Sequence, residues 1–137
     1  MAVIEELIRL EENGKLSFGN YLMDTKKKVL DFEVEGDLYK VKTFREITKL
    51  EKNGKLLYES VPGTTVHNFS FTDKKVCFKL EAEEDVQVTM ELEPEKEYKV
   101  LVDDVYVGKI NSNLSGKVNF SVEMKNTALD IVIEKVK

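Results

Sequence analysis

The stretch Val86-Gln87-Val88-Thr89-Met90-Glu91-Leu92 decides the fold class, because its apolar side chains occupy every second position. Successive side chains of a β-strand point to opposite faces of a sheet, so this period of two predicts a half-buried strand. The same alternation recurs in further runs, which are 76–81, 98–102, 105–107, 118–122 and 129–133.

Turn-forming residues separate these runs: Asp103-Asp104, Asn111-Ser112-Asn113, Ser115-Gly116 and Lys125-Asn126. Short strands that follow one another roughly every 8–12 residues are typical of antiparallel sandwiches and barrels. We therefore predict a single all-β domain over residues 1–137. We expect an antiparallel β-sandwich, jelly-roll or Greek-key-like, with roughly 11–13 short strands.

The first half of the chain also carries strand and turn signals. Residues 31–34 and 38–42 flank Glu35-Gly36-Asp37, which predicts a hairpin with a glycine-containing turn. The dipeptide Pro62-Gly63 favours a type II turn. A regular strand over 66–71 would place Val66, Asn68 and Ser70 on one face and His67, Phe69 and Phe71 on the other.

One segment occurs twice: residues 6–16 align without a gap with residues 46–56, and seven of the eleven positions are identical. Both copies contain Asn-Gly, which favours a two-residue hairpin turn because both residues tolerate positive φ. The repeat is either one hairpin solution used twice or a partial duplication, or it marks two sub-sheets with pseudo-symmetry. Residues 3–12 also fit a short helix ending at Asn13-Gly14, but we expect a strand, because the second copy follows a strand-rich stretch.

Composition and charge exclude several function classes. The chain has a net charge of −5, and residues 81–97 hold eight carboxylates against one lysine, so we expect neither nucleic acid nor membrane as a partner. A single cysteine and a single histidine argue against a disulfide framework, a metal centre or a cofactor. No signal-peptide pattern and no apolar run of roughly 18 residues is present, which leads us to expect a cytoplasmic protein.

Catalytic motifs are absent from the sequence: it has neither a Gly-x-Ser-x-Gly elbow nor a phosphate-binding loop. We therefore predict no catalytic residues, and a non-catalytic binding or assembly module with a protein or glycan ligand. Many strands imply sheet edges, and edges are often covered by another subunit, so we expect a homo-oligomer. A hydrolase that combines His67 with a serine and an acidic residue is a further alternative.

A carbohydrate-binding or glycan-active β-sandwich protein is the main alternative. Sugars stack on flat aromatic rings, and the candidate rings are Tyr39, Tyr58, Tyr98 and Tyr106. The competing interpretation is that these rings fill the core, where aromatic side chains bury large areas.

Three stretches carry a family resemblance: Gly14-Lys15-Leu16-Ser17-Phe18-Gly19-Asn20-Tyr21, Phe44-Arg45-Glu46-Ile47-Thr48-Lys49-Leu50-Glu51-Lys52-Asn53-Gly54, and Tyr58-Glu59-Ser60-Val61-Pro62-Gly63-Thr64. With the Val102-Asp103 turn, they resemble a family of small uncharacterised all-β proteins of Clostridium-like bacteria, often labelled "endosialidase" without an evident catalytic motif. Sialidases hold the substrate carboxylate with an arginine cluster, whereas this chain has only Arg9 and Arg45. The resemblance therefore implies a family but no activity.

Overall fold

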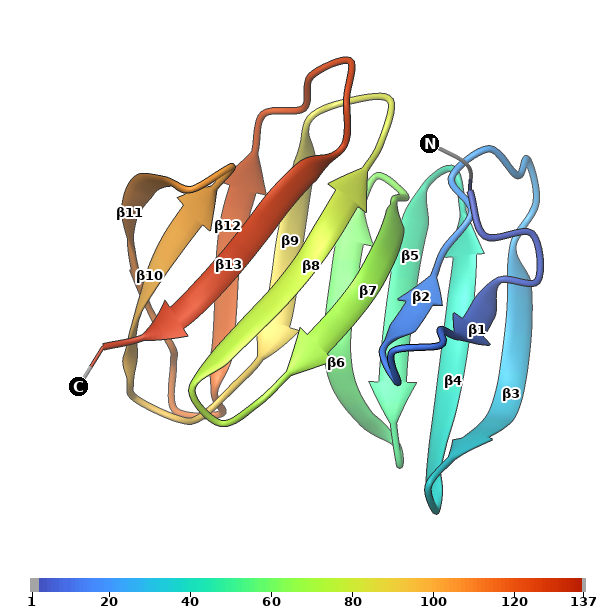
Figure 1. Ribbon diagram of the computed structural model, residues 1–137, viewed down its shortest axis with the longest axis horizontal. Coiled ribbons are helices and arrows are strands. Elements are labelled where there is room, and N and C mark those ends of the chain that lie inside the picture. Colours follow the sequence, from blue (N-terminus) through green and yellow to red (C-terminus); the bar gives the residue numbers. More distant parts are fainter. Residues whose placement is uncertain (1–2, 137) are drawn as a thin grey trace.

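The computed structural model describes residues 3–136, which form thirteen strands and contain no helix. The strands make two antiparallel sheets that pack face to face (Figure 1), so the prediction of an all-β sandwich is confirmed. The seven-stranded sheet has the order β1-β2-β7-β8-β13-β10-β11, with bounds Ile8–Leu10, Leu16–Phe18, Thr65–Phe71, Lys75–Glu81, Leu129–Lys135, Glu97–Val102 and Val105–Asn111. The six-stranded sheet has the order β12-β9-β6-β5-β4-β3, with bounds Lys117–Val122, Val86–Glu91, Lys55–Val61, Ile47–Lys52, Asp37–Phe44 and Lys27–Val34.

The last six strands pair in a nested order. β10 pairs with β11, β9 with β12, and β8 with β13. A long hairpin that rolls up so that its strands alternate between two sheets produces this pairing, which is the jelly-roll type of wrapping. By contrast, β3 to β6 form a meander in which each strand pairs with the next one along the chain.

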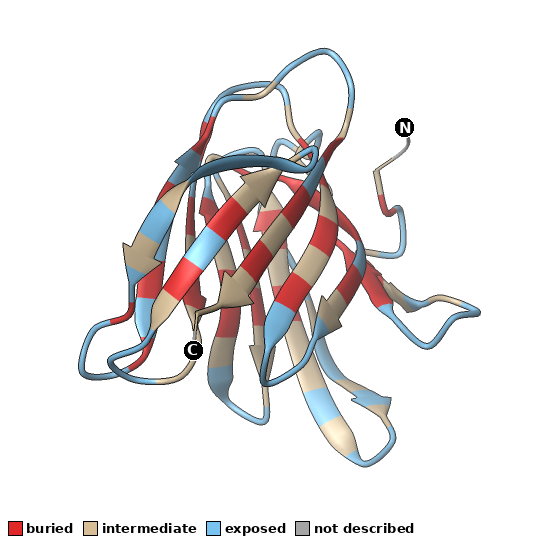
Figure 2. Cartoon of the chain, turned by 60° about the vertical axis from the view of Figure 1, so that its left-hand side comes forward, coloured by how far each residue is buried: buried red, intermediate tan, exposed pale blue. Residues whose placement is uncertain are grey.

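The alternation in the sequence becomes an inner and an outer face of each sheet. Buried and exposed residues alternate along β12, and bands of buried residues recur along the strands in Figure 2. One hydrophobic cluster takes side chains from both sheets, including Leu50, Val88, Met90, Ile131 and Ile133. Burying such a side chain contributes roughly 1.5–3 kcal/mol, so these positions hold the two layers together.

Three two-residue turns follow the sequence signals. Glu35-Gly36 joins β3 to β4, Asn53-Gly54 joins β5 to β6, and Asp103-Asp104 joins β10 to β11. Both residues of each turn have positive φ, between 49° and 86°. This conformation belongs to type I′ turns, whose twist matches the twist of the flanking strands.

The two copies of the repeated segment fold differently. The second copy forms β5, β6 and the tight Asn53-Gly54 turn. The first copy forms β1 and β2, in which Leu10 pairs with Leu16 across a longer loop, and Gly14 but not Asn13 has positive φ. The strand expected in the first copy is confirmed, and the alternative of a helix over residues 3–12 is wrong.

Two local predictions for the segment after β6 are wrong. Gly63 does not have the positive φ that a type II turn requires. In β7 a bulge interrupts the register between His67 and Ser70, and Asn68 has a φ of 55°. The bulge shifts the alternation by one residue, so Val66 and Phe69 are both buried instead of facing opposite sides.

Candidate functional site

Two adjoining clefts open at one end of the sandwich, where the β3–β4, β5–β6 and β7–β8 turns lie (lower end in Figure 1). Their volumes are about 400 and 340 Å³, and both are lined by Lys52, Leu57 and Phe71. We call the two clefts together the end groove. The apolar interior reaches the surface there, because core residues such as Leu57, Val76 and Ile133 are part of the lining.

The larger cleft of the end groove has an apolar floor. The floor residues come from five strands and one connection: Leu57, Phe71, Val76, Leu92, Tyr98 and Ile133. Phe71 is the most open of them, at 41% exposure, and its ring packs against that of Phe69 with centroids 6.2 Å apart. A mostly apolar concave surface with a few polar groups at its edge is what small-molecule sites usually offer.

Charged side chains surround this floor, and several are held in ion pairs. Lys55 lies 3.4 Å from Glu91, and Lys135 lies 2.6 Å from Glu93. The hydrogen bond from Lys135 lowers the pKa of Glu93, which keeps this carboxylate ionised at neutral pH. Among residues 3–136, no carboxylate forms an ion pair with Lys74 or Lys75, which also line the cleft.

The smaller cleft is more polar and contains Tyr39. This half-buried ring lies on the same side of β4 as the buried Val41, so it faces the interior at the open end of the sheet. Burial raises the pKa of Tyr39, so its hydroxyl loses its proton less readily than that of an exposed tyrosine. Asp37 is held ionised there, because a hydrogen bond from Asn53 lowers its pKa.

The structure separates the four predicted sugar-binding tyrosines. Tyr58 is fully buried and Tyr98 is 4% exposed, so neither ring offers a free face for a sugar to stack on. Tyr98 contributes to the floor of the larger cleft, and its hydroxyl accepts a hydrogen bond from the Glu93 amide at 3.1 Å. Tyr39 lines the smaller cleft, and Tyr106 is 53% exposed on β11, at the edge of the other sheet. Burial thus removes Tyr58 and Tyr98 from the predicted set.

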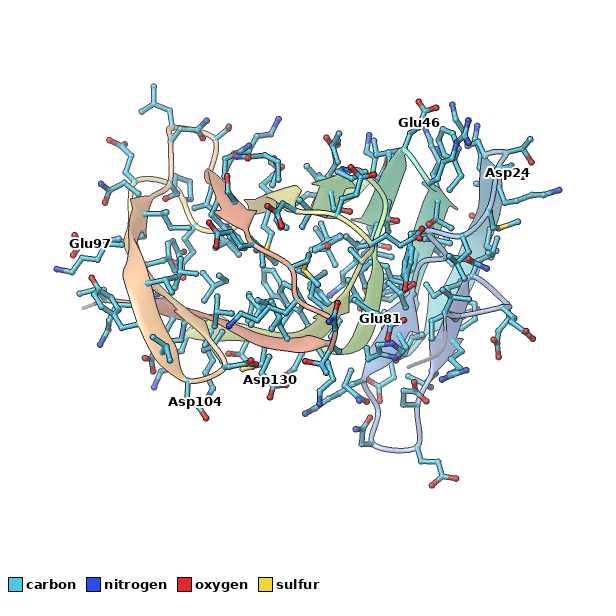
Figure 3. The ribbon with its side chains drawn as sticks, turned by 90° about the horizontal axis from the view of Figure 1, so that it is seen from above. Asp24, Glu46, Glu81, Glu97, Asp104 and Asp130 are labelled. Atoms are coloured by element: carbon cyan, nitrogen blue, oxygen red, sulfur yellow. The ribbon has the colours of Figure 1, made fainter. Side chains whose placement is uncertain are left out.

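A second cluster of titratable groups surrounds His67. His67 is 8% exposed, and its Nε2 lies 3.8 Å from Oε2 of Glu81. The other oxygen of this carboxylate, Oε1, accepts a hydrogen bond from the Tyr21 hydroxyl at 3.3 Å. Burial lowers the pKa of His67, against the weaker opposing effect of the Glu81 charge. Burial, with the Glu81 carboxylate, also raises the pKa of Tyr21 to about 12. Figure 3 shows Glu81 beside the N-terminal segment of the chain.

This cluster lacks the geometry of a serine hydrolase. The hydroxyl of Ser17, on the neighbouring strand β2, donates to Glu11 at 2.5 Å and accepts from the Asn68 amide at 3.0 Å. In the described part of the chain, no hydrogen bond connects His67 to a serine. Within residues 3–136 no three histidine, cysteine or acidic side chains come together to hold a metal ion.

Of the residues that line the end groove, Tyr39 and Tyr98 were predicted as candidate site residues, whereas Leu57 and Phe71 were not. In the sequence, Leu57 and Phe71 look like ordinary strand residues, because alternation of apolar and polar residues does not indicate where the core ends. The bulge in β7 is what turns Phe71 to the same face as the buried Phe69. A hydrophobic residue directly before a polar turn such as Thr72-Asp73-Lys74 is the only signal that could have indicated it.

Two further findings bear on identity. The described residues include no helix long and apolar enough to cross a membrane. Comparison with known proteins found no matching family model, no matching curated protein and no matching solved structure.

Proposed function

We propose that the protein is a non-catalytic binding module whose ligand occupies the end groove. The observation that carries the proposal is the apolar floor around Leu57 and Phe71, which is open at one end of the sandwich. A soluble domain gains no stability from an exposed aromatic ring, whereas a ligand that covers it is bound through the hydrophobic effect.

The charges at the rim narrow the class of ligand. Lys52, Lys55 and Lys135 are already paired with carboxylates, so they add little net charge to the groove. Lys74 and Lys75 lie at one side of the apolar floor without such partners in residues 3–136, and Asp73, the one other charged lining residue there without an ion pair, leaves this side with a net positive charge. The complementary ligand is therefore a small amphipathic anion, with an apolar body for the floor and an acidic group for these two lysines.

Calorimetry with decanoate and with decanol, which share an apolar chain but differ in charge, tests this function. We expect decanoate to bind the wild-type protein, and Phe71→Asp to weaken this binding at least tenfold. Leu30→Asp is the matched control, because Leu30 is exposed on β3 and lies outside both clefts. Replacing Lys74 and Lys75 by glutamine should weaken decanoate but not decanol. If decanoate does not bind the wild-type protein, the proposal is contradicted.

A neutral glycan is the second candidate, and the position of Tyr39 supports it. The ring lines the smaller cleft together with Glu35, Asp37 and Ser70, which supply hydrogen-bonding groups for sugar hydroxyls. Screening a panel of neutral and acidic oligosaccharides distinguishes the two candidates. Binding that Tyr39→Ala abolishes and Lys74→Gln leaves unchanged would favour the glycan over the amphipathic anion.

A further inference from the structure

We propose that β11 is a pairing edge through which two copies of this chain join, antiparallel and related by a two-fold axis. The two seven-stranded sheets would then form one continuous sheet across the dimer. This inference concerns the edge of the sandwich and does not depend on what occupies the end groove.

The outer side of β11 has free backbone groups. β11 is the last strand of its sheet and pairs only with β10. In Figure 1 it is the left-most strand. The amide and carbonyl groups on its outer side therefore form an edge to which another strand can add.

Several exposed positions of β11 carry apolar side chains, although exposed positions of a strand are usually polar. Val105, Tyr106 and Val107 are exposed by 62%, 53% and 58%, and they follow one another directly. A bulge at Val107 accounts for part of this pattern, since Leu101 pairs with Tyr106 whereas Val100 pairs with Gly108. Three consecutive exposed apolar residues on an edge strand favour association with another chain.

The other sheet edges are protected more strongly than β11, which has one bulge and one lysine, Lys109, in its seven residues. β1 is only three residues long. β3 begins after Lys26 with two further lysines and is interrupted between Val29 and Phe32, where Asp31 has a φ of 55°. Short edge strands, lysines and irregular register are the features that prevent strands from pairing between molecules. β12 presents polar residues, with Asn119 donating to Thr89 on the neighbouring strand.

The sequence of β11 is complementary to itself in one register, which identifies the partner as a second copy. A two-fold axis between Tyr106 and Val107 sets Asp104 of each copy opposite Lys109 of the second copy. Lys109 now makes only a 3.9 Å contact with Glu97, and both groups are about half exposed. Such exposed pairs contribute little, so Lys109 is free to turn toward the new carboxylate. Asp104 lies at the hairpin tip and is labelled in Figure 3.

The interface formed in this way is small. One pair of strands buries less than the roughly 1,200 Å² of standard stable interfaces, so we expect a weak dimer whose population rises with protein concentration. Sedimentation equilibrium at a series of protein concentrations measures its dissociation constant.

The first pair of variants locates the interface. Val107→Lys places a charge on the pairing edge and should weaken the dimer at least tenfold. Leu30→Lys makes the same kind of change at an equally exposed position on β3 and should leave the dimer unchanged. Thermal unfolding of both variants checks that they fold. A wild-type protein that stays monomeric throughout, or a dimer that Val107→Lys leaves intact, would overturn the proposal.

A charge exchange then tests the register. Lys109→Glu places like charges opposite each other and should weaken the dimer, whereas adding Asp104→Lys to it should restore pairing. Restoration identifies the two-fold antiparallel arrangement. A double variant that dimerises no better than Lys109→Glu alone would exclude this arrangement.

Discussion

The rings of Phe18 and Tyr58 meet edge to face in the core, with centroids 5.4 Å apart and planes inclined by 74°. The two residues follow equivalent positions of the repeated segment, and they reach each other from opposite sheets. Each ring also packs against Phe69, so the two copies share one aromatic cluster. The repeat therefore builds the two facing walls of one part of the sandwich, although its two turns differ.

The first prediction concerns the contribution of the Tyr58 hydroxyl to the stability of the core. It shares a 2.8 Å hydrogen bond with Oγ1 of Thr64, which is also bonded to Ser60, and all three residues are fully buried. Tyr58→Phe leaves Thr64 with one partner fewer inside the core and should lower the free energy of unfolding by about 1–2 kcal/mol. Urea denaturation measures the loss, and Tyr106→Phe, at an exposed ring, should change nothing.

The two asparagines of the repeat should respond differently to the same substitution. Asn53 has a φ of 50°, and its side chain accepts a hydrogen bond from the Leu38 amide at 2.9 Å. Asn53→Ala should cost about 1–2 kcal/mol, since alanine is strained at positive φ and the bond to the neighbouring turn is lost. Asn13 also accepts a hydrogen bond, from the Lys15 amide at 3.0 Å, but it lies outside the positive-φ region, so Asn13→Ala adds no backbone strain and should cost clearly less. Equal losses in denaturation experiments would contradict the difference between the two turns.

Substituting two glycines by alanine distinguishes two causes of lost stability, which are a strained backbone conformation and close packing against a neighbouring segment. Gly19 and Gly36 have φ values of 100° and 86°. A Cβ on Gly19 would collide with the backbone carbonyl of Thr64, whereas one on Gly36 meets nothing within 4 Å. Gly36→Ala should cost about 1 kcal/mol for the strained φ alone. Gly19→Ala should cost at least about 1–3 kcal/mol more, because the backbone has to move. Similar melting temperatures for both variants would contradict this close approach.

The stability of the protein should fall on mild acidification because of His67. Burial lowers the pKa of this side chain in the folded state below its usual value of 6.5, while the unfolded chain keeps the usual value. The unfolded state therefore binds more protons as the pH falls through about 6.5, and stability declines from there toward the folded pKa. At pH values above the pKa of His67 in the unfolded chain, this loss of stability is absent.

Chemical denaturation between about pH 7.5 and 5.5 measures this dependence of stability on pH. Histidine is the side chain that ordinarily titrates in this range, and His67 is the one histidine of the sequence. His67→Gln should flatten the profile in this window. A wild-type protein that becomes more stable on acidification would show instead that the attraction of Glu81 outweighs burial.

Much of the fold could be predicted from the sequence, because strand alternation is a local signal. The runs around Val88, Val118 and Ile131 each show a buried face in the structure, as their patterns indicate. The turns at Gly36 and Asp103-Asp104 were also readable, since few residues accept positive φ.

The candidate site could not be predicted in the same way. Whether a tyrosine such as Tyr58 faces the core depends on where its strand lies in the sheet, which is a tertiary property. The alternation in β7 failed at Asn68, where the bulge adds a residue that no dipeptide signal marks. Phe71, which lines the groove, follows that bulge. The face of the sheet on which it lies was therefore predicted wrongly relative to Val66.

The nested pairing of β8 to β13 affects how fast the protein can fold. β10 and β11 are neighbours in sequence, and once they pair, β9 and β12 are brought close, followed by β8 and β13. Each step then closes only a short loop, so the entropy lost per step is small even though the outermost pair spans most of this half. We expect φ-values, measured from the kinetics of conservative variants, to be higher for Val100 in β10 than for Ile133 in β13. The reverse order would show that folding starts from the ends of this half instead of from its central hairpin.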